Sequence, residues 1–311
     1  MKINICAFNN IHPIHNNYSG ILDQVECLSS YLESQSFDYQ ISYTLDPSAL
    51  NLVIENFNEE SALTIESFCN KWNKKILVIM TEHISLDLSM GDADRKGAIK
   101  FGSYDINNTD YIGNISQRFY SLSMIYEYVV GFAAIGELPF LNDLKKIFYV
   151  EKVYRFNYPA VINKKTGSYT CKPKYDISFS GFVTEYRSKV FIELGKKYKF
   201  KRYDIVEDGI KREENARTAK IAVNIPQEGD WPWVSPMRVV YYLSIGIPCV
   251  HIGKGDNTLF YDKVLSWVDV EQAIKSPDLV YKKQVDAYMN LSIDGGSLKS
   301  LFGVWSMLEN L

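Results

Sequence analysis

The chain has 311 residues, of which 46% are hydrophobic and 23% charged, and its formal net charge is −3. A disordered chain has fewer apolar residues and more net charge, so this composition indicates a globular protein. The length favours two domains. The small net charge does not indicate the broad basic surface of a nucleic-acid-binding protein, so we expect no nucleic-acid partner.

The first half of the chain alternates strand-like and helix-like patterns. We expect strands at 2–8, 38–44, 50–57, 75–80 and 131–136, and helices at 19–34, 59–72 and 117–130. The run at 75–80 is continuously apolar, which is typical of a central strand buried on both faces. Strands that alternate with helices predict a parallel sheet covered by helices.

Residues 149–174 show little periodicity and contain Pro159, Gly167 and Pro173, so we place the passage between two domains there. A second series then follows, with strands at 176–180, 201–206, 219–224 and 248–252, helices at 185–198, 213–218 and 235–245, and further elements at 269–273 and 277–291. An amphipathic helix is expected at 297–311. The resulting domains are 1–150 and 151–296, followed by that last helix.

Three segments of the second half resemble the donor domain of GT-B-type glycosyltransferases, most closely the CgeB-like and group-1-related branches. They read YDISFSGFVTEYRSKVFIEL at 175–194, ENARTAKIAVNIP at 214–226 and SPMRVVYYLSIGIPCVHIG at 235–253. The resemblance implies two Rossmann-like domains facing a cleft, with the C-terminal helix crossing back to the first domain. It also implies transfer of a sugar from a nucleotide-sugar donor to a glycan or lipid-linked acceptor hydroxyl, in bacterial surface polysaccharide synthesis.

The chemistry of such a donor site requires groups that hold phosphate. Main-chain N–H groups at a helix N-terminus bind anions, with help from the helix dipole, and a guanidinium matches two phosphate oxygens at once. We therefore expect donor binding by Ser180, Gly181, Arg187, Asn224, Glu228, Ser235 and Arg238. Ser235 followed by Pro236 also suits a simple helix start, because proline is favoured in the first helical turn.

The sequence departs from the retaining branch of this family. Where many retaining members carry two glutamates eight positions apart, this chain has Trp233 and Tyr241. The catalytic group is therefore expected in the first domain, on loops that follow parallel strands, because ligands bind beyond the carboxyl ends of such strands. We expect Glu82 to act as base or stabiliser, with His15 or His83 next in line, since either type of side chain can accept a proton near neutral pH.

No metal site and no cofactor are expected. His12 and His15 lack an evident third ligand, and in the fold that the resemblance implies, helix termini and arginine take the place of a metal. The five cysteines are widely spaced, and their odd number favours a reducing compartment. Without a signal-peptide pattern or a long apolar run, we expect a cytoplasmic protein, with peripheral association at the inner face of the membrane left open.

Two other functions remain as alternatives. One is a catalytically silent GT-B-like module that binds a glycan or a partner protein. The other is a nicotinamide-dependent Rossmann enzyme, which is less favoured because residues 9–19 contain no glycine-rich turn. A G-x-S-x-G hydrolase elbow is absent, and Gly253-Lys254-Gly255 lacks the serine or threonine of a phosphate-binding loop.

Overall fold

A computed structural model describes the chain in segments. These segments are 2–7, 22–55, 58–81, 85–86, 99–100, 119–138, 141, 143–148, 153–158, 173–203, 209–227, 229, 234–255 and 258–291. By its internal contacts the chain divides into two compact units, one built mainly on residues up to Tyr158 and the other mainly on residues from Pro159 to Ser292. Each unit is an α/β structure with a parallel sheet, as the alternating pattern predicts.

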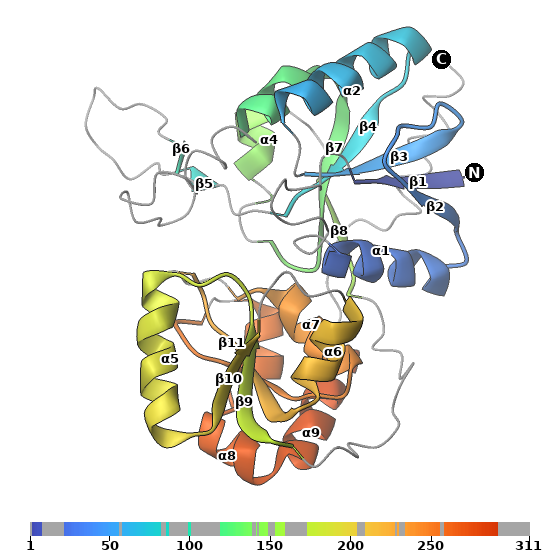
Figure 1. The fold of residues 1–311 in the computed structure, drawn as a ribbon. Coiled ribbons are helices and arrows are strands. Elements are labelled where there is room, and N and C mark those ends of the chain that lie inside the picture. The colour runs from blue at the N-terminus through green and yellow to red at the C-terminus, as the bar shows by residue number, and fades with distance from the viewer. Residues whose placement is uncertain are drawn as a thin grey trace. The chain divides into compact units, whose positions relative to one another are not determined.

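The described part of the first unit contains a six-stranded sheet in the order β2-β1-β3-β4-β7-β8 (Figure 1). Its strands are β1 (Lys2–Cys6), β2 (Asp38–Ser42), β3 (Ala49–Ile54), β4 (Ile76–Ile79), β7 (Val129–Ile135) and β8 (Val153–Phe156). Every neighbouring pair is parallel. All residues of β3 and β4 are buried, which confirms the prediction of a central apolar strand at 75–80.

The helices of the first unit pack on both faces of this sheet. Within the described part they include α1 (Leu22–Ser34), α2 (Glu59–Trp72), α4 (Asp143–Phe148) and a short helix at 119–125. The short strands β5 (Ser85–Leu86) and β6 (Ile99–Lys100) form a separate antiparallel pair. Figure 1 shows α2 and α4 on one face and α1 on the other. The Asn58 side chain accepts a hydrogen bond from the main-chain N–H of Ser61, so α2 begins at an N-cap, and it occupies the range that the sequence predicts.

Two expectations about the first unit need correction. The helix expected at 117–130 is helical only through residue 125 within the described part; a 3₁₀ turn, η1 (Tyr126–Tyr128), follows, and β7 begins at Val129. β-branched Val129 and Val130 favour the strand, which pairs with β4 in the core. The passage expected at 149–174 also contains a strand, because β8 adds to the edge of the sheet with Phe156 fully buried.

The second unit contains, over its described residues, a four-stranded parallel sheet in the order β10-β9-β11-β12. The strands are β9 (Tyr175–Ser180), β10 (Phe200–Tyr203), β11 (Ala219–Asn224) and β12 (Cys249–His251). The helices are α5 (Glu185–Lys197), α6 (Gly209–Ala216), α7 (Pro236–Ser244), α8 (Val270–Lys275) and α9 (Pro277–Met289), with a π-helical turn, η3 (Tyr261–Leu265), before α8. Figure 1 shows α5 on one face and α6 and α7 on the other, as right-handed crossovers require.

In both sheets, strands are added on both sides of the first strand. β1 lies between β2 and β3 in the first unit, and β9 lies between β10 and β11 in the second. In each sheet, two neighbouring strands, β1 and β3 or β9 and β11, lead into connections that run to opposite sides. In doubly wound α/β proteins, ligands bind in the crevice at the carboxyl ends of two such strands, which is called the switch point. In the second unit this switch point lies between β9 and β11.

A pair of glycine variants tests the backbone of the second unit. Gly195 lies in α5 and Gly246 follows α7 with φ +84°, and at both an added Cβ meets open space. Gly195→Ala should stabilise the unit by about 0.5–1 kcal/mol, because glycine is a weak helix former. Gly246→Ala should destabilise it by about 1 kcal/mol, because a left-handed backbone strains an L-residue.

Hydrogen exchange of the β11 amides measures the stability of this unit alone in each variant. Changes of the same sign at both glycines would contradict the conformations assigned to them.

Candidate anion site at the switch point of the second sheet

Two polar residues end the strands on either side of the switch point. Ser180 is the last residue of β9 and is half-buried, and Asn224 is the last residue of β11 and is only 1% exposed. The predicted donor residues Ser180 and Asn224 thus lie at the edge where a doubly wound sheet binds its ligand. A buried side-chain amide needs hydrogen-bond partners, so the residues that bond to Asn224 are held at this edge.

The N-terminus of α7 comes next in the chain after the end of β11. Pro236 occupies the first turn, and the exposed Ser235 stands at the N-cap position without a capping hydrogen bond from its side chain. The first main-chain N–H groups of a helix have no partner within it. Together with the positive end of the helix dipole, they give α7 a start that favours an anion.

Arg238 is held at the same edge by two contacts. Its Nη1 donates to Asn224 Oδ1 at 3.2 Å, and its guanidinium carbon lies 5.5 Å from the centre of the Phe179 ring. Burial raises the pKa of the Cys249 thiol on β12 to about 12, and the positive charge of Arg238 acts against that rise. Arg238 therefore lies beside the ends of β9 and β11.

Gly181 makes room for this guanidinium. A Cβ at this position would stand 2.9 Å from Phe179 Cζ and 3.4 Å from Arg238 Nη2. Any larger side chain would therefore displace the Phe179 ring and cover Nη2. The absence of a Cβ at Gly181 thus leaves room for Arg238 Nη2 beside the turn after β9.

Arg187, in contrast, is bonded to the main chain. It is 3% exposed, and its Nη1 donates to the carbonyl of Phe182 at 2.7 Å while its Nη2 donates to that of Ile225 at 2.6 Å. Nε also donates to the carbonyls of Ile225 and Pro226, at 3.0 and 3.2 Å. These bonds join the turn after β9 to the loop after β11. The sequence grouped Arg187 with the donor-binding residues, whereas its visible hydrogen bonds support the two loops around Arg238.

Several predicted residues lie outside the described part of the chain. These are the catalytic candidates His15, Glu82 and His83, and the donor-site candidate Glu228. Their parts in the site stay predictions.

Sequence analysis did not single out two buried or half-buried polar residues at strand ends. His251 is the last residue of β12 and the register partner of Asn224, and Glu55, 3% exposed, directly follows β3 at the switch point of the first sheet. The hydroxyl of Thr81 donates to Glu55 Oε2 at 2.9 Å. A polar residue at the end of an apolar strand, or directly after it, was the available signal for both.

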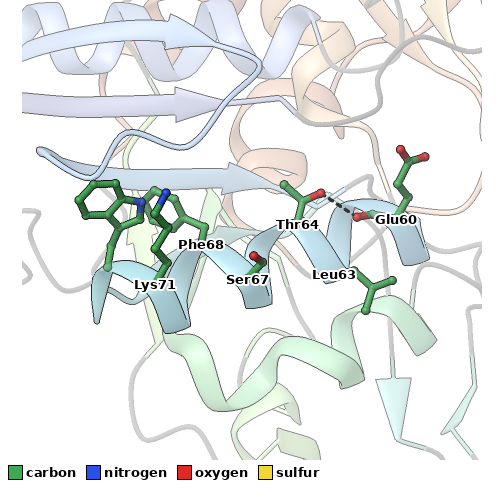
Figure 2. A pocket seen from close by; sticks show the side chains of 7 residues that line it. Glu60, Leu63, Thr64, Ser67, Phe68 and Lys71 are labelled. Atoms are coloured by element: carbon green, nitrogen blue, oxygen red, sulfur yellow. Dashed lines mark hydrogen bonds between the residues drawn. The ribbon is translucent and has the colours of Figure 1, made fainter.

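A shallow hollow on the first unit does not share these features. Figure 2 shows its lining, which comes entirely from α2: Glu60, Leu63, Thr64, Ser67, Phe68, Lys71 and Trp72. The Lys71 ammonium lies 5.1 Å from the centre of the Trp72 ring, and Thr64 donates to the Glu60 carbonyl. No strand end contributes to this hollow, so we place the candidate site at the sheet edge of the second unit.

The fold defines a class: an α/β protein with two doubly wound, Rossmann-like parallel sheets. The edge at the switch point of the second sheet is its candidate anion site. Within the described segments, no helix is long and apolar enough to cross a membrane. The same segments contain no cluster of three or more histidine, cysteine, aspartate or glutamate side chains placed to hold a metal ion.

No model of a known protein family matches the chain, and no curated protein matches it. Among solved structures, it is similar to the crystal structure of accessory secretory protein 1, 2 and 3 in Streptococcus pneumoniae. The match has a TM-score of 0.41 at 10% identity and covers 95% of this chain and 58% of that chain. The chain thus spans less than two thirds of that chain's length, and at this TM-score the likeness assigns neither a family nor a function.

The contacts of Arg187 with main-chain carbonyls predict that it stabilises the second unit. Arg187→Met should lower the free energy of unfolding of the second unit by at least about 2 kcal/mol, because buried carbonyls lose charged donors. Arg217→Met is the matched control, since Arg217 pairs with Glu213 in a partly exposed position and such pairs contribute about 1 kcal/mol or less. Hydrogen exchange of β11 amides reports both; equal effects would contradict the assignment.

Proposed function

We propose that this protein is a glycosyltransferase that binds the phosphates of a nucleotide-sugar donor at the carboxyl edge of the second sheet. The observation that carries the proposal is the convergence of the Ser180-Gly181 turn, the end of β11 and the Arg238 end of α7 at one switch point. Three segments distant in sequence supply a helix N-terminus, a guanidinium and a close main-chain approach. These are the groups that phosphate binding requires.

The same groups fit the chemistry of transfer. When the bond between the sugar and the phosphate breaks, its electron pair and negative charge pass to the leaving phosphate oxygen. Fixed N–H dipoles and a guanidinium stabilise that charge in the transition state without reorganising. We propose that α7 and Arg238 fill this role without a metal, and that Ser235 adds its hydroxyl while Glu228 binds hydroxyls of the donor.

The remaining parts of the reaction are assigned to the first unit. In the proposed transfer, an acceptor hydroxyl attacks the anomeric carbon and its proton passes to a base, for which we propose Glu82, with His15 or His83 as the next candidates. The proposal includes the GT-B arrangement of the two units, kinship with the CgeB-like branch, and a glycan or lipid-linked acceptor in bacterial surface polysaccharide synthesis. An acceptor of that kind would bring the protein to the inner face of the membrane.

One observation favours a second candidate, the catalytically silent module of the same fold. Tyr241 stands at the position where many retaining relatives in the resembled family carry a glutamate. Its ring packs against the guanidinium carbon of Arg212 at 3.6 Å. This site therefore holds a stacked pair instead of a carboxylate, and measured turnover separates the two candidates.

The donor site is tested by Arg238→Ala. We expect nucleotide-sugar affinity to fall roughly tenfold to a hundredfold, because a charged hydrogen bond contributes about 1.5–3 kcal/mol. A thermal-shift panel of uridine, guanosine and cytidine sugars first selects the ligand, since binding raises stability by mass action. Calorimetry then compares Arg238→Ala with Arg217→Ala, an arginine of the same unit bonded to Glu213. Unchanged affinity in Arg238→Ala would exclude this donor site.

The catalytic base is tested by Glu82→Gln. Turnover should fall at least about a hundredfold while donor affinity stays the same, because an amide cannot accept the proton of the acceptor. Glu55→Gln serves as the comparison, since Glu55 is the buried carboxylate at the switch point of the first sheet. Full turnover in Glu82→Gln with loss in Glu55→Gln would move the assignment to Glu55.

A further inference from the structure

A chain of hydrogen bonds crosses the ends of two neighbouring strands in the second unit. Arg238 Nη1 donates to Asn224 Oδ1 at 3.2 Å, and Asn224 Nδ2 lies 3.2 Å from His251 Nδ1. On its other side, His251 Nε2 lies 2.8 Å from the carbonyl oxygen of Lys254. The chain therefore links Arg238 to the loop after β12 through two side chains.

Chemistry fixes the direction of every bond in this chain. A guanidinium only donates, so the Asn224 atom that faces Arg238 must be its carbonyl oxygen. The amide nitrogen of Asn224 then faces His251 and donates, so Nδ1 of His251 must accept and carries no proton. The carbonyl of Lys254 only accepts, so Nε2 carries the hydrogen. This pattern of one accepting and one donating nitrogen matches the neutral imidazole with its hydrogen on Nε2.

Local sequence places the two ends of this chain. Asn224 and His251 are paired in register at the ends of β11 and β12, which brings their side chains together. Gly253 and Gly255 flank Lys254: a Cβ at Gly253 would stand 2.8 Å from Pro226 Cγ, and one at Gly255 would stand 2.0 Å from Tyr261 Cε1. Only glycines allow this loop to approach so closely that the Lys254 carbonyl reaches His251.

We infer that His251 is a positioning residue of the anion site: its unprotonated Nδ1 orients the Asn224 amide, and the amide carbonyl holds the Arg238 guanidinium in place for a phosphate. This inference rests on the proposed function and adds to it a residue that does not itself touch the donor. Asn224 is 1% exposed, so solvent cannot replace His251 as a hydrogen-bond partner of its amide. The orientation of the amide therefore depends on Arg238 and His251.

The positioning role predicts how anion affinity changes when His251 is protonated. With a hydrogen on both ring nitrogens, Nδ1 would face the Asn224 amide N–H group, and the amide would have to turn. Its N–H₂ would then face Arg238, and the guanidinium would lose its acceptor. Anion affinity should therefore fall as the pH is lowered. A histidine that bound the phosphate directly would show the opposite change, because its new positive charge would raise the affinity.

Other charged or titratable groups surround His251 and must be separated from it. Among the residues that the structure describes, these groups include Arg238 on α7, Lys254 in the following loop, Tyr261 of η3, whose ring centre lies 5.8 Å from that of His251, and Cys249 on β12. Burial raises the pKa of Cys249 to about 12, so its thiol stays neutral at lower pH. A variant that lacks only the imidazole retains all four groups and serves as the reference.

The experiment compares wild type, His251→Asn and His251→Leu as full chains. The probe is whichever of UDP-glucose, GDP-mannose and CMP-sialic acid binds wild type, titrated by calorimetry from about pH 8 to about pH 5.5, where histidines ordinarily change charge. Wild-type affinity should fall about tenfold over this range. The Oδ1 of an asparagine at 251 replaces the Nδ1 acceptor, so His251→Asn should keep its affinity at all pH values. His251→Leu should bind about tenfold more weakly throughout, because the acceptor is lost.

Nitrogen NMR of the imidazole rings gives a readout that needs no ligand. At about pH 8, where histidines are ordinarily neutral, the His251 signals should show a proton on Nε2 only. A proton on Nδ1, an affinity that rises at lower pH, or wild-type affinity in a folded His251→Leu would each overturn the inference and leave the donor site standing. If no probe binds wild type, the proposed function fails and the positioning role fails with it, whatever tautomer NMR shows.

Discussion

Parallel pairing of all four strands in the second sheet brings every strand end to one edge. Because β9 is flanked by β10 on one side and β11 on the other, the connections that leave β9 and β11 run to opposite sides, and ligands of doubly wound sheets bind at such an edge. Ser180, Asn224 and His251, each the last residue of its strand, are neighbours for this reason alone. The Gly181 turn and the start of α7 lie at the same edge, so strand order brings together the groups of the proposed anion site.

The two arginines beside this edge differ in burial and in hydrogen-bond partners. Arg187 is almost fully buried, and three main-chain carbonyls receive its donors, which is how a protein accommodates a desolvated charge. Arg238 is half-buried, and one of its nitrogens is bonded to Asn224 while another lies beside Gly181, which has no Cβ to approach it. A phosphate would therefore meet a guanidinium that Arg187 supports indirectly through the loops.

Periodicity predicted most elements because burial on a sheet or helix face imposes it. The strand at 219–224 and the helix at 59–72 have the predicted bounds, and α7 begins at the proline that marked it. Edge strand β8 was missed because only four residues carry its pattern, within a stretch rich in turn signals. His251 was missed for a different reason: its meaning depends on its register with Asn224, and register between strands separated by a helix is a tertiary property.

By itself, the sequence determined the α/β class, the order of most elements along the chain, and the residue types available to hold a phosphate. These follow from local periodicity and from side-chain chemistry. Only the tertiary structure decided that Arg187 would turn to the main chain, that Arg238 would bond to Asn224, and that His251 would complete the chain of hydrogen bonds. The reason is physical, because strand order selects which distant residues become neighbours, and burial then selects the partners that each polar group must take.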